Sequence, residues 1–302
     1  MPILTHALEL NEPIPARNTE EEVYEFIVKE LDKAAEVLPE KRTESSEIGR
    51  ATKGAALALK AKMSIYFHKY ETAAKAAKEV MDLGVYGLFE NYENLFLPEY
   101  ENNKEVIFDR QYVQNAYNST IGSLIDQYFG PLMMGGWEAL SPTQDLIDAY
   151  PCVDGKSIKE SKLYDPAKPF ENRDPRLAYS ILWDGQELAG KTYDSNGMGN
   201  GNATRTGYSM RKYVNPKNDG NNEYGWTNFI YIRYADILLT YAEAQNELKG
   251  PDKSVYAAIN QVRQRPSVEL PPLPEGLSKE QMREAIRLER RLEFTFEGIH
   301  LF

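Results

Sequence analysis

Residues 282–298 read MREAIRLERRLEFTFEG, and this stretch predicts one helix with both ends specified. Ser278, with Gln281 three residues later, is typical of a helix N-cap, and Gly298 is typical of the residue that ends a helix. Apolar residues at helical spacing form one stripe, which consists of Met282, Ala285, Ile286, Leu292 and Phe296. We therefore expect a helix with one face packed in the core.

The charges of this helix form two rows of like sign. One row is Glu289, Glu293 and Glu297, and the other is Arg283, Arg287 and Arg291. Like charges four residues apart disfavour an isolated helix by roughly 0.2–0.5 kcal/mol per pair. The rows therefore predict ion-pair partners from other parts of the fold.

Four stretches of the chain together resemble the signatures of the SusD/RagB family, in the family's order. They are residues 49–56 (GRATKGAA), 172–177 (NRDPRL), 233–244 (RYADILLTYAEA) and 289–302 (ERRLEFTFEGIHLF). The last family signature continues into Asp-Leu and an Arg-Trp, whereas this sequence stops at Phe302. The resemblance covers nearly the whole chain.

The resemblance implies a noncatalytic surface lipoprotein of a Bacteroidetes-type bacterium. Such proteins bind a glycan or another nutrient and deliver it to a TonB-dependent, SusC-like transporter in the outer membrane. The first residues, MPILT, show neither a basic nor a long apolar signal region, and no later stretch approaches the ~18 apolar residues of a membrane span. Since family members begin with a lipoprotein signal and a helical region, we expect this sequence to be an internal fragment.

Composition excludes several classes of partner. The 302 residues are 42% hydrophobic and 27% charged, as in a soluble globular protein. A net charge of −11 argues against binding nucleic acid or an anionic membrane surface. Cys152 is the single cysteine, so disulfides and thiolate metal clusters are not expected.

Helical periodicity predicts a mainly α fold of tetratricopeptide-like hairpins. Thr19 to Glu22 is a capping box that begins a helix reaching Leu38. Alanine-rich helices are expected over 51–67 and 71–83, and a second helical hairpin over 234–248 and 253–263. Between them, Gly, Asn, Pro and aromatic residues accumulate and periodicity weakens, with a short helix at 145–150.

We expect one partial SusD-like domain over residues 1–302, because no clean boundary interrupts the chain. Its parts would be a helical hairpin part (19–99), an irregular ligand-loop part (100–228) and a C-terminal helical part (229–302). Binding is expected in the irregular part, since long loops on a rigid scaffold usually carry it.

Two motifs of the middle region resemble ligand-binding loops, but each lacks the neighbouring residues that binding requires. Residues 185–192 (GQELAGKT) match the phosphate-loop pattern, but the glycine-rich residues that follow cannot form the helix that phosphate binding needs. Asp194, Asn196 and Asn200 could surround calcium, but no glutamate closes the loop at Arg205. No cofactor or metal is therefore predicted.

Catalytic signatures are weak. The three histidines are scattered and no Gly-x-Ser-x-Gly elbow occurs, so neither zinc nor a serine nucleophile is supported. Acidic pairs such as Asp145 and Asp148 are expected by chance among 46 acidic residues, and a glycosidase would need two of them across a cleft. We predict no enzyme.

Aromatic residues are the strongest lead to a ligand site, because flat sugar faces stack on aromatic rings. All three tryptophans lie in the irregular middle, and the expected platform residues are Trp137, Trp183, Tyr128 and Tyr193. The alternative for each is ordinary core packing. We expect Tyr208, Lys212 and Tyr213 to be structural.

Three hypotheses follow. The first is a noncatalytic glycan-binding lipoprotein at the surface of the outer membrane. The second is a cytosolic helical-repeat adaptor that binds a protein or peptide through its hairpins, which the absent signal peptide favours. The third is an enzyme, either a glycosidase or a nucleotide hydrolase. Release of product from glycan or ATP separates the third from the others.

Overall fold

The computed structural model describes residues 1–113, 122–196, 204–218, 220 and 224–299. Its long helices are α1 (Glu20–Val37), α2 (Lys53–Tyr66), α3 (Tyr70–Asp82), α7 (Tyr234–Lys249), α8 (Lys253–Arg263) and α9 (Lys279–Glu293). Short helices are α4 (Ile125–Phe129), α5 (Gln144–Ala149) and α6 (Pro175–Ser180), with 3-10 turns η1 (Ser45–Glu47), η2 (Asn94–Phe96), η3 (Pro98–Tyr100) and η4 (Leu132–Met134). The predicted mainly α fold is confirmed.

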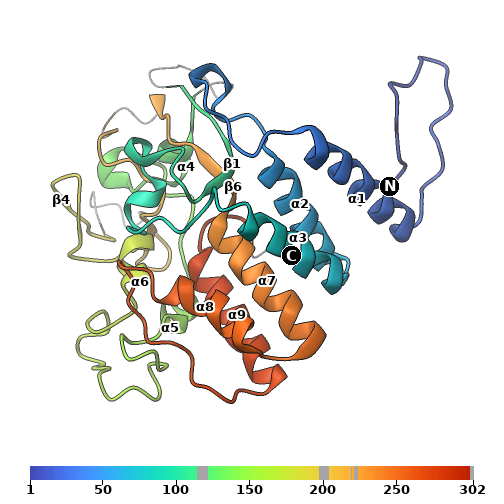
Figure 1. Ribbon diagram of the computed structural model, residues 1–302. Helices are drawn as coiled ribbons and strands as arrows, with labels where there is room; N and C mark the ends of the chain where they lie inside the picture. The colour runs from blue at the N-terminus through green and yellow to red at the C-terminus, as the bar shows by residue number, and fades with distance from the viewer. Residues whose placement is uncertain (114–121, 197–203, 219, 221–223, 300–302) are drawn as a thin grey trace.

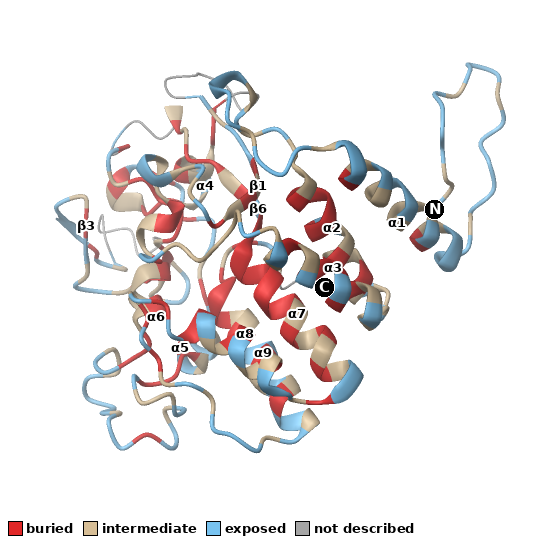
Figure 2. Ribbon diagram, in the orientation of Figure 1, coloured by how far each residue is buried: buried red, intermediate tan, exposed pale blue. Residues whose placement is uncertain are grey.

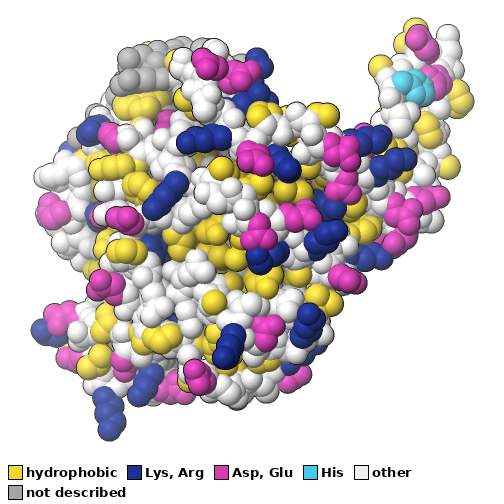
Figure 3. Space-filling model, viewed as in Figure 1, with side chains coloured by type: hydrophobic (Ala, Val, Ile, Leu, Met, Phe, Trp, Pro, Cys, Tyr) yellow, Lys and Arg dark blue, Asp and Glu magenta, His cyan; other side chains and the backbone are white. Residues whose placement is uncertain are grey.

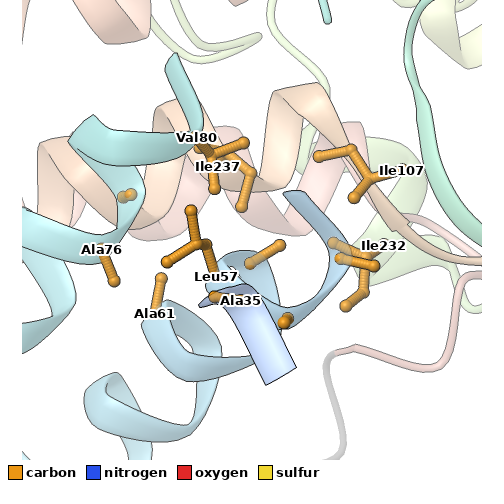
Figure 4. Packing of buried hydrophobic residues seen from close by; sticks show 12 residues of the cluster. Ala35, Leu57, Ala61, Ala76, Val80, Ile107, Ile232 and Ile237 are labelled. Atoms are coloured by element: carbon orange, nitrogen blue, oxygen red, sulfur yellow. The ribbon is translucent and has the colours of Figure 1, made fainter. Parts of the chain in front are cut away.

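Helical hairpins form one side of the molecule, and the loop-rich middle region forms the other (Figure 1). The hairpin α2–α3 packs on α7, which packs in turn on α8 and α9. Close approach follows from small side chains, since Ala58, Ala61, Ala73 and Ala77 are fully buried. Figure 4 shows Leu57, Val80 and Ile237 meeting in this core, and Figure 2 shows burial concentrated on α7.

Strands are few and short. β1 (Val106–Arg110) pairs antiparallel with β6 (Phe229–Arg233), placing Val106 opposite Arg233. Two smaller pairs lie in the middle region: β2 (Ile181–Leu182) with β5 (Ser209–Met210), and β3 (Glu187–Leu188) with β4 (Lys191–Thr192). The β1–β6 pair joins the N-terminal helical part to the start of α7, because β6 runs directly into that helix.

Helix α9 begins as predicted and ends earlier than predicted. Ser278 and Gln281 form a capping box at its start. The predicted end at Gly298 is wrong, since α9 ends at Glu293 and Phe296 adopts a left-handed φ of 65°. The Thr295 hydroxyl bonds to the Arg291 and Leu292 carbonyls and so competes with the helical backbone pattern.

The predicted partners for the glutamate row are present as a buried ion cluster. Its cations are Arg176, Lys212, Arg233, Arg263 and Arg265, and its anions are Glu105, Asp174, Glu289, Glu293 and Glu297. All ten residues are at most 7% exposed. Five positive and five negative charges leave the cluster neutral, which burial requires.

Glu293 lies at the centre of the buried ion cluster. Its Oε1 accepts hydrogen bonds from Arg233 (2.7 Å) and Arg265 (2.8 Å), and its Oε2 accepts one from Arg176 (2.8 Å). Burial alone would raise the pKa of Glu293, but these three guanidinium groups outweigh burial and hold that pKa well below its usual range. The carboxylate is therefore charged at neutral pH and holds β6, α6 and α9 together.

The arginine row on the far side of α9 has its own partners. Arg283 donates to Glu247 of α7 (2.6 Å) and Arg291 to Asp145 of α5 (2.6 Å). Among the described residues, the ion-pair partner of Arg287 is Glu284 on its own helix. These pairs are partly or fully exposed and contribute less than the buried ones. The expectation of partners from other parts of the fold is therefore confirmed for the glutamate row and for Arg283 and Arg291, and it is wrong for Arg287.

The surface is mixed in charge. Acidic side chains gather along α1, whose first turn holds Glu20, Glu21 and Glu22 (Figure 3). Residues 1–18 form an arm that extends away from the body beside α1 (Figure 1). In the described part of the chain, no helix is long and apolar enough to cross a membrane.

Candidate functional site

Two of the predicted aromatic residues come together on the surface of the middle region. The indole of Trp137 is 61% exposed and the ring of Tyr128 is 38% exposed. Their ring centroids lie 5.0 Å apart at an interplanar angle of 63°, an edge-to-face contact. We call Trp137 with Tyr128 the aromatic platform.

Backbone hydrogen bonds hold the aromatic platform against α4. The Trp137 amide donates to the Gln127 carbonyl (2.7 Å), and the Ala139 amide donates to the Tyr128 carbonyl (2.9 Å). Both rings therefore project from backbone that hydrogen bonds hold in place. Such pairing limits the conformational entropy that a ligand must remove from the site.

A glycine-lined turn makes this pairing possible. The chain leaves α4 at Gly130, passes through η4 and returns through Gly135, which has a φ of 86°. A Cβ at Gly136 would lie 2.1 Å from the Gly130 carbonyl oxygen, and a Cβ at Gly130 would lie 2.3 Å from the Asp126 carbonyl oxygen. The backbone therefore approaches itself more closely than any larger residue permits.

Asp126, beneath the aromatic platform, ties it to a second loop. Its Oδ1 accepts from the Asn215 amide (2.9 Å), and its Oδ2 accepts from the Asn218 side-chain amide (2.8 Å). The residue is 2% exposed, and burial raises the pKa of Asp126 to about 6 although both hydrogen bonds lower it. Within the described ranges Asp126 pairs with no cation, so its charge at neutral pH opposes folding.

Replacing Asp126 by asparagine is expected to change how stability depends on pH. The folded state holds a proton on Asp126 between about pH 4 and 6 where the unfolded state does not, so wild-type stability falls as pH rises through that window. Relative to Asp126→Asn, the wild type should lose about 2–3 kcal/mol between pH 4 and 7. Urea unfolding of both proteins at pH 4, 5, 6 and 7 measures this.

The asparagine introduced at position 126 can be accommodated because the side-chain amide of Asn218 can flip. The Asn218 Oδ1 is buried and has no hydrogen-bond partner among the described residues, so a flipped Asn218 would present that oxygen to the new amide group. A constant stability difference between the two proteins from pH 4 to 7 would contradict the raised pKa.

Tyr193 is buried and does not belong to the aromatic platform. Its side chain is 2% exposed, and its hydroxyl donates to Glu138 Oε1 (2.6 Å). Burial, followed by the neighbouring Glu138 carboxylate, raises the pKa of Tyr193 well above its usual range. Since Glu138 follows Trp137 and has a left-handed φ of 50°, this bond supports the strained backbone beside the indole.

Trp183 belongs to a different group of aromatic residues. Its indole stacks on Phe170 with centroids 4.2 Å apart and an interplanar angle of 12°. Phe170 in turn meets Tyr208, whose hydroxyl donates to Gln144 (2.6 Å). One face of the half-buried Trp183 ring is therefore already covered, and the structure does not join it to the aromatic platform.

The two rejected motifs have ordinary local structures. Residues 185–192 contain the β3–β4 hairpin, with Ala189 (φ 53°) and Gly190 (φ 73°) in the positive-φ conformations of a type I′ turn. Asp194 Oδ1 accepts the Asn196 amide, while Asn200 lies outside the described residues. Within the described ranges, no group of three or more His, Cys, Asp or Glu residues could hold a metal ion.

Sequence reasoning missed Asp126 and Glu138, which position the aromatic platform. Their acidic side chains look like ordinary surface residues, because nothing local indicates that Asn215, Asn218 and Tyr193 reach them. The one signal available was the spacing of Gly130, Gly135 and Gly136 around Trp137, since clustered glycines mark close backbone approach.

The chain is similar to proteins of one family throughout its length. Residues 104–302 match the model of the SusD family. The sequence is 26% identical over 308 residues to a SusD-like protein of Bacteroides ovatus, covering 95% of this chain and 51% of that protein. It is 27% identical to SusD-like protein P2 of Formosa agariphila, covering 93% of this chain and 55% of that protein.

Solved structures give the same result. A SusD-like carbohydrate binding protein from Bacteroides fragilis matches with a TM-score of 0.85 and 32% identity, over 93% of this chain and 57% of that one. Another SusD-like protein from Bacteroides fragilis matches with a TM-score of 0.83 and 34% identity, over 98% of this chain and 62% of that one. The chain spans little more than half the length of the curated relatives named here.

Proposed function

Because this chain belongs to the SusD family, we propose that it is part of a noncatalytic protein that binds glycans at the bacterial cell surface. A solved relative with 32% identity is a carbohydrate binding protein by name. The described residues offer an exposed aromatic pair and no arrangement that requires catalysis. Both observations support binding without turnover.

The observation that carries the proposal is the exposure of Trp137 beside Tyr128. Large aromatic rings are normally buried, so an indole that is 61% exposed and held by backbone pairing calls for a partner. A sugar ring offers a flat C–H face to the indole, while its hydroxyl groups stay hydrated or meet neighbouring polar groups. Tyr193 and Asp126 would act as positioning residues, through Glu138 and the second loop.

Removing the indole is expected to weaken glycan capture enough to be seen in gels. Trp137→Ala should lose the retardation that the wild-type chain shows in native gels containing starch, inulin, xylan, pectin or host-type glycans. Loss of one stacked ring is worth about 1–2 kcal/mol, or roughly tenfold in affinity. Tyr66→Ala is the matched control, because Tyr66 is also exposed (41%) but lies on α2.

Three outcomes contradict the proposal or redirect it. Equal retardation of Trp137→Ala and the wild type would move the site away from the aromatic platform, with Trp183→Ala as the next variant. Release of sugars from the gel would indicate an enzyme. A folded chain that no glycan retards would favour the helical-repeat adaptor, which peptide-binding assays would then examine.

We further propose that the whole protein delivers its glycan to a SusC-like, TonB-dependent transporter while a lipid anchor holds it at the outer membrane. Membership of the SusD family supports this partner and this location, because the family resemblance implies both of them as well as the fold. Co-purification of the full-length protein with a transporter encoded beside its gene tests the partner. Labelling of intact cells with an impermeant reagent tests the location.

A further inference from the structure

A hollow separate from the aromatic platform lies beside the β3–β4 hairpin. It encloses about 230 Å³, and Trp137 and Tyr128 are not among its lining residues. The lining includes Glu93, Leu97, Tyr179, Leu188, Arg211 and Pro216. Since pockets for drug-sized ligands measure roughly 300–1,000 Å³, this hollow suits one small ring rather than a chain of rings.

A charged pair forms the polar edge of the hollow. Arg211 Nη2 donates to Glu93 Oε1 (2.7 Å), and Arg211 Nη1 donates to the Glu187 carbonyl (3.2 Å). Two of the five guanidinium N–H groups are used in these bonds. The second oxygen of Glu93 has no partner among the described residues. One side of the hollow therefore presents an acceptor and a donor next to each other.

Tyr179 supplies a ring and a hydroxyl on the same hollow. It is half-buried with its ring 6.4 Å from that of Tyr92, and no hydrogen bond to its hydroxyl is found in the described parts of the chain. Tyr179 lines the hollow together with Glu93 and Arg211. Burial, followed by the Glu93 carboxylate, raises the pKa of Tyr179, so its hydroxyl keeps its proton at neutral pH. The hydroxyl is available to a ligand.

Apolar side chains cover the remaining walls. Leu97 and Pro216 come from separate loops, and Leu188 comes from the hairpin whose letters resemble a phosphate loop. These walls suit the C–H groups of a ring. They give no site for phosphate, because the cation that a phosphate would need, Arg211, is already paired with Glu93. The β3–β4 hairpin thus contributes Leu188 to the wall of the hollow.

We propose that this hollow binds a single uncharged sugar ring through two adjacent hydroxyl groups. One hydroxyl would donate to Glu93 while its neighbour accepts from Arg211, and the Tyr179 hydroxyl would bond to a third position on the ring. An uncharged ring is favoured because Arg211 and Glu93 neutralise each other. The hollow adds a site for one ring to the aromatic platform and does not depend on that platform.

Titration of the whole chain with single sugars tests this inference. Calorimetry with glucose, galactose, mannose, fructose, xylose and glucuronate should give saturable binding of at least one neutral sugar and weaker binding of glucuronate. Tyr179→Phe should weaken the neutral sugar about fivefold, through loss of one neutral hydrogen bond. Glu93→Gln should weaken it at least tenfold, because a charged acceptor is lost.

Glu93→Gln provides the sharper readout because it should also reverse the preference. Without its carboxylate partner, Arg211 keeps a net positive charge, so glucuronate should then bind better than the neutral sugar. A merely structural role for Glu93 would lower both affinities together. Circular dichroism of each variant checks that the fold is intact.

The outcomes separate this site from the aromatic platform. Trp137→Ala should leave single-sugar binding unchanged, and Glu93→Gln should leave gel retardation by polysaccharide unchanged. Absence of saturable binding for every sugar, or unchanged affinities in both Tyr179→Phe and Glu93→Gln, would overturn the inference. If polysaccharide gels fail to retard the chain but single sugars still bind, the result would contradict the proposed role of the aromatic platform and leave this inference standing.

Discussion

Replacing Glu293 by alanine is expected to lower the free energy of unfolding by about 3–5 kcal/mol, the range measured when one partner of a buried ion pair is removed. Glu293 accepts hydrogen bonds from Arg176, Arg233 and Arg265, and it is 0% exposed. Its removal leaves the buried ion cluster with one uncompensated positive charge and no water to solvate it. Urea unfolding followed by circular dichroism measures the loss.

A second glutamate on the same helix is the matched control. The Glu284 side chain is 71% exposed, and its ion-pair partner in the described part of the chain is Arg287 on the same helix, so Glu284→Ala should change the free energy of unfolding by less than about 0.5 kcal/mol. The variants share helix, residue type and replacement, and differ in burial. A loss below about 1 kcal/mol for Glu293→Ala would show that the cluster relaxes or admits water when Glu293 is absent.

Replacing Gly136 by alanine is expected to abolish glycan capture while the helical part stays folded. The added methyl group would lie 2.1 Å from the Gly130 carbonyl oxygen and 2.8 Å from the Asp126 carbonyl oxygen, and neither is the end of a flexible side chain. The turn must therefore open, at a local cost of about 2–3 kcal/mol. Opening the turn breaks the bond from the Trp137 amide to Gln127 and moves the indole away from Tyr128.

Gly87→Ala is the control for this variant. A Cβ at Gly87 would meet only the flexible side chain of Lys104, at 3.8 Å, so both stability and gel retardation should stay close to wild type. Gly136→Ala should lose gel retardation, while its far-UV circular dichroism spectrum should stay like that of the wild type. Full retardation of Gly136→Ala would mean that the aromatic platform does not depend on this turn.

Helices with strong local signals could be predicted almost to the residue. The capping boxes at Thr19 and Ser278 satisfy backbone amides within one turn, so their effect does not depend on the rest of the fold. The end of α9 could not be predicted in this way. Glu297 is drawn toward Lys212 and Arg233, which lie 85 and 64 residues earlier, and the helix ends before it.

For the candidate site, sequence reasoning selected residue types and the structure assigned their places. Four aromatic residues in an irregular region looked equivalent, because composition carries no information on exposure. The structure exposes Trp137 and Tyr128, buries Tyr193 and stacks Trp183 on Phe170. Exposure depends on which loops meet, and Asp126 decides this by bonding to residues about 90 positions later.

The sequence by itself determined the helices, the family resemblance and the need for buried partners of the glutamate row, because each follows from residues within a few turns of one another. Only the tertiary structure decided which arginines meet Glu293, where α9 ends and which aromatic rings face solvent. These features depend on contacts between segments far apart in the chain, and the order of residues does not specify such contacts until the chain is folded.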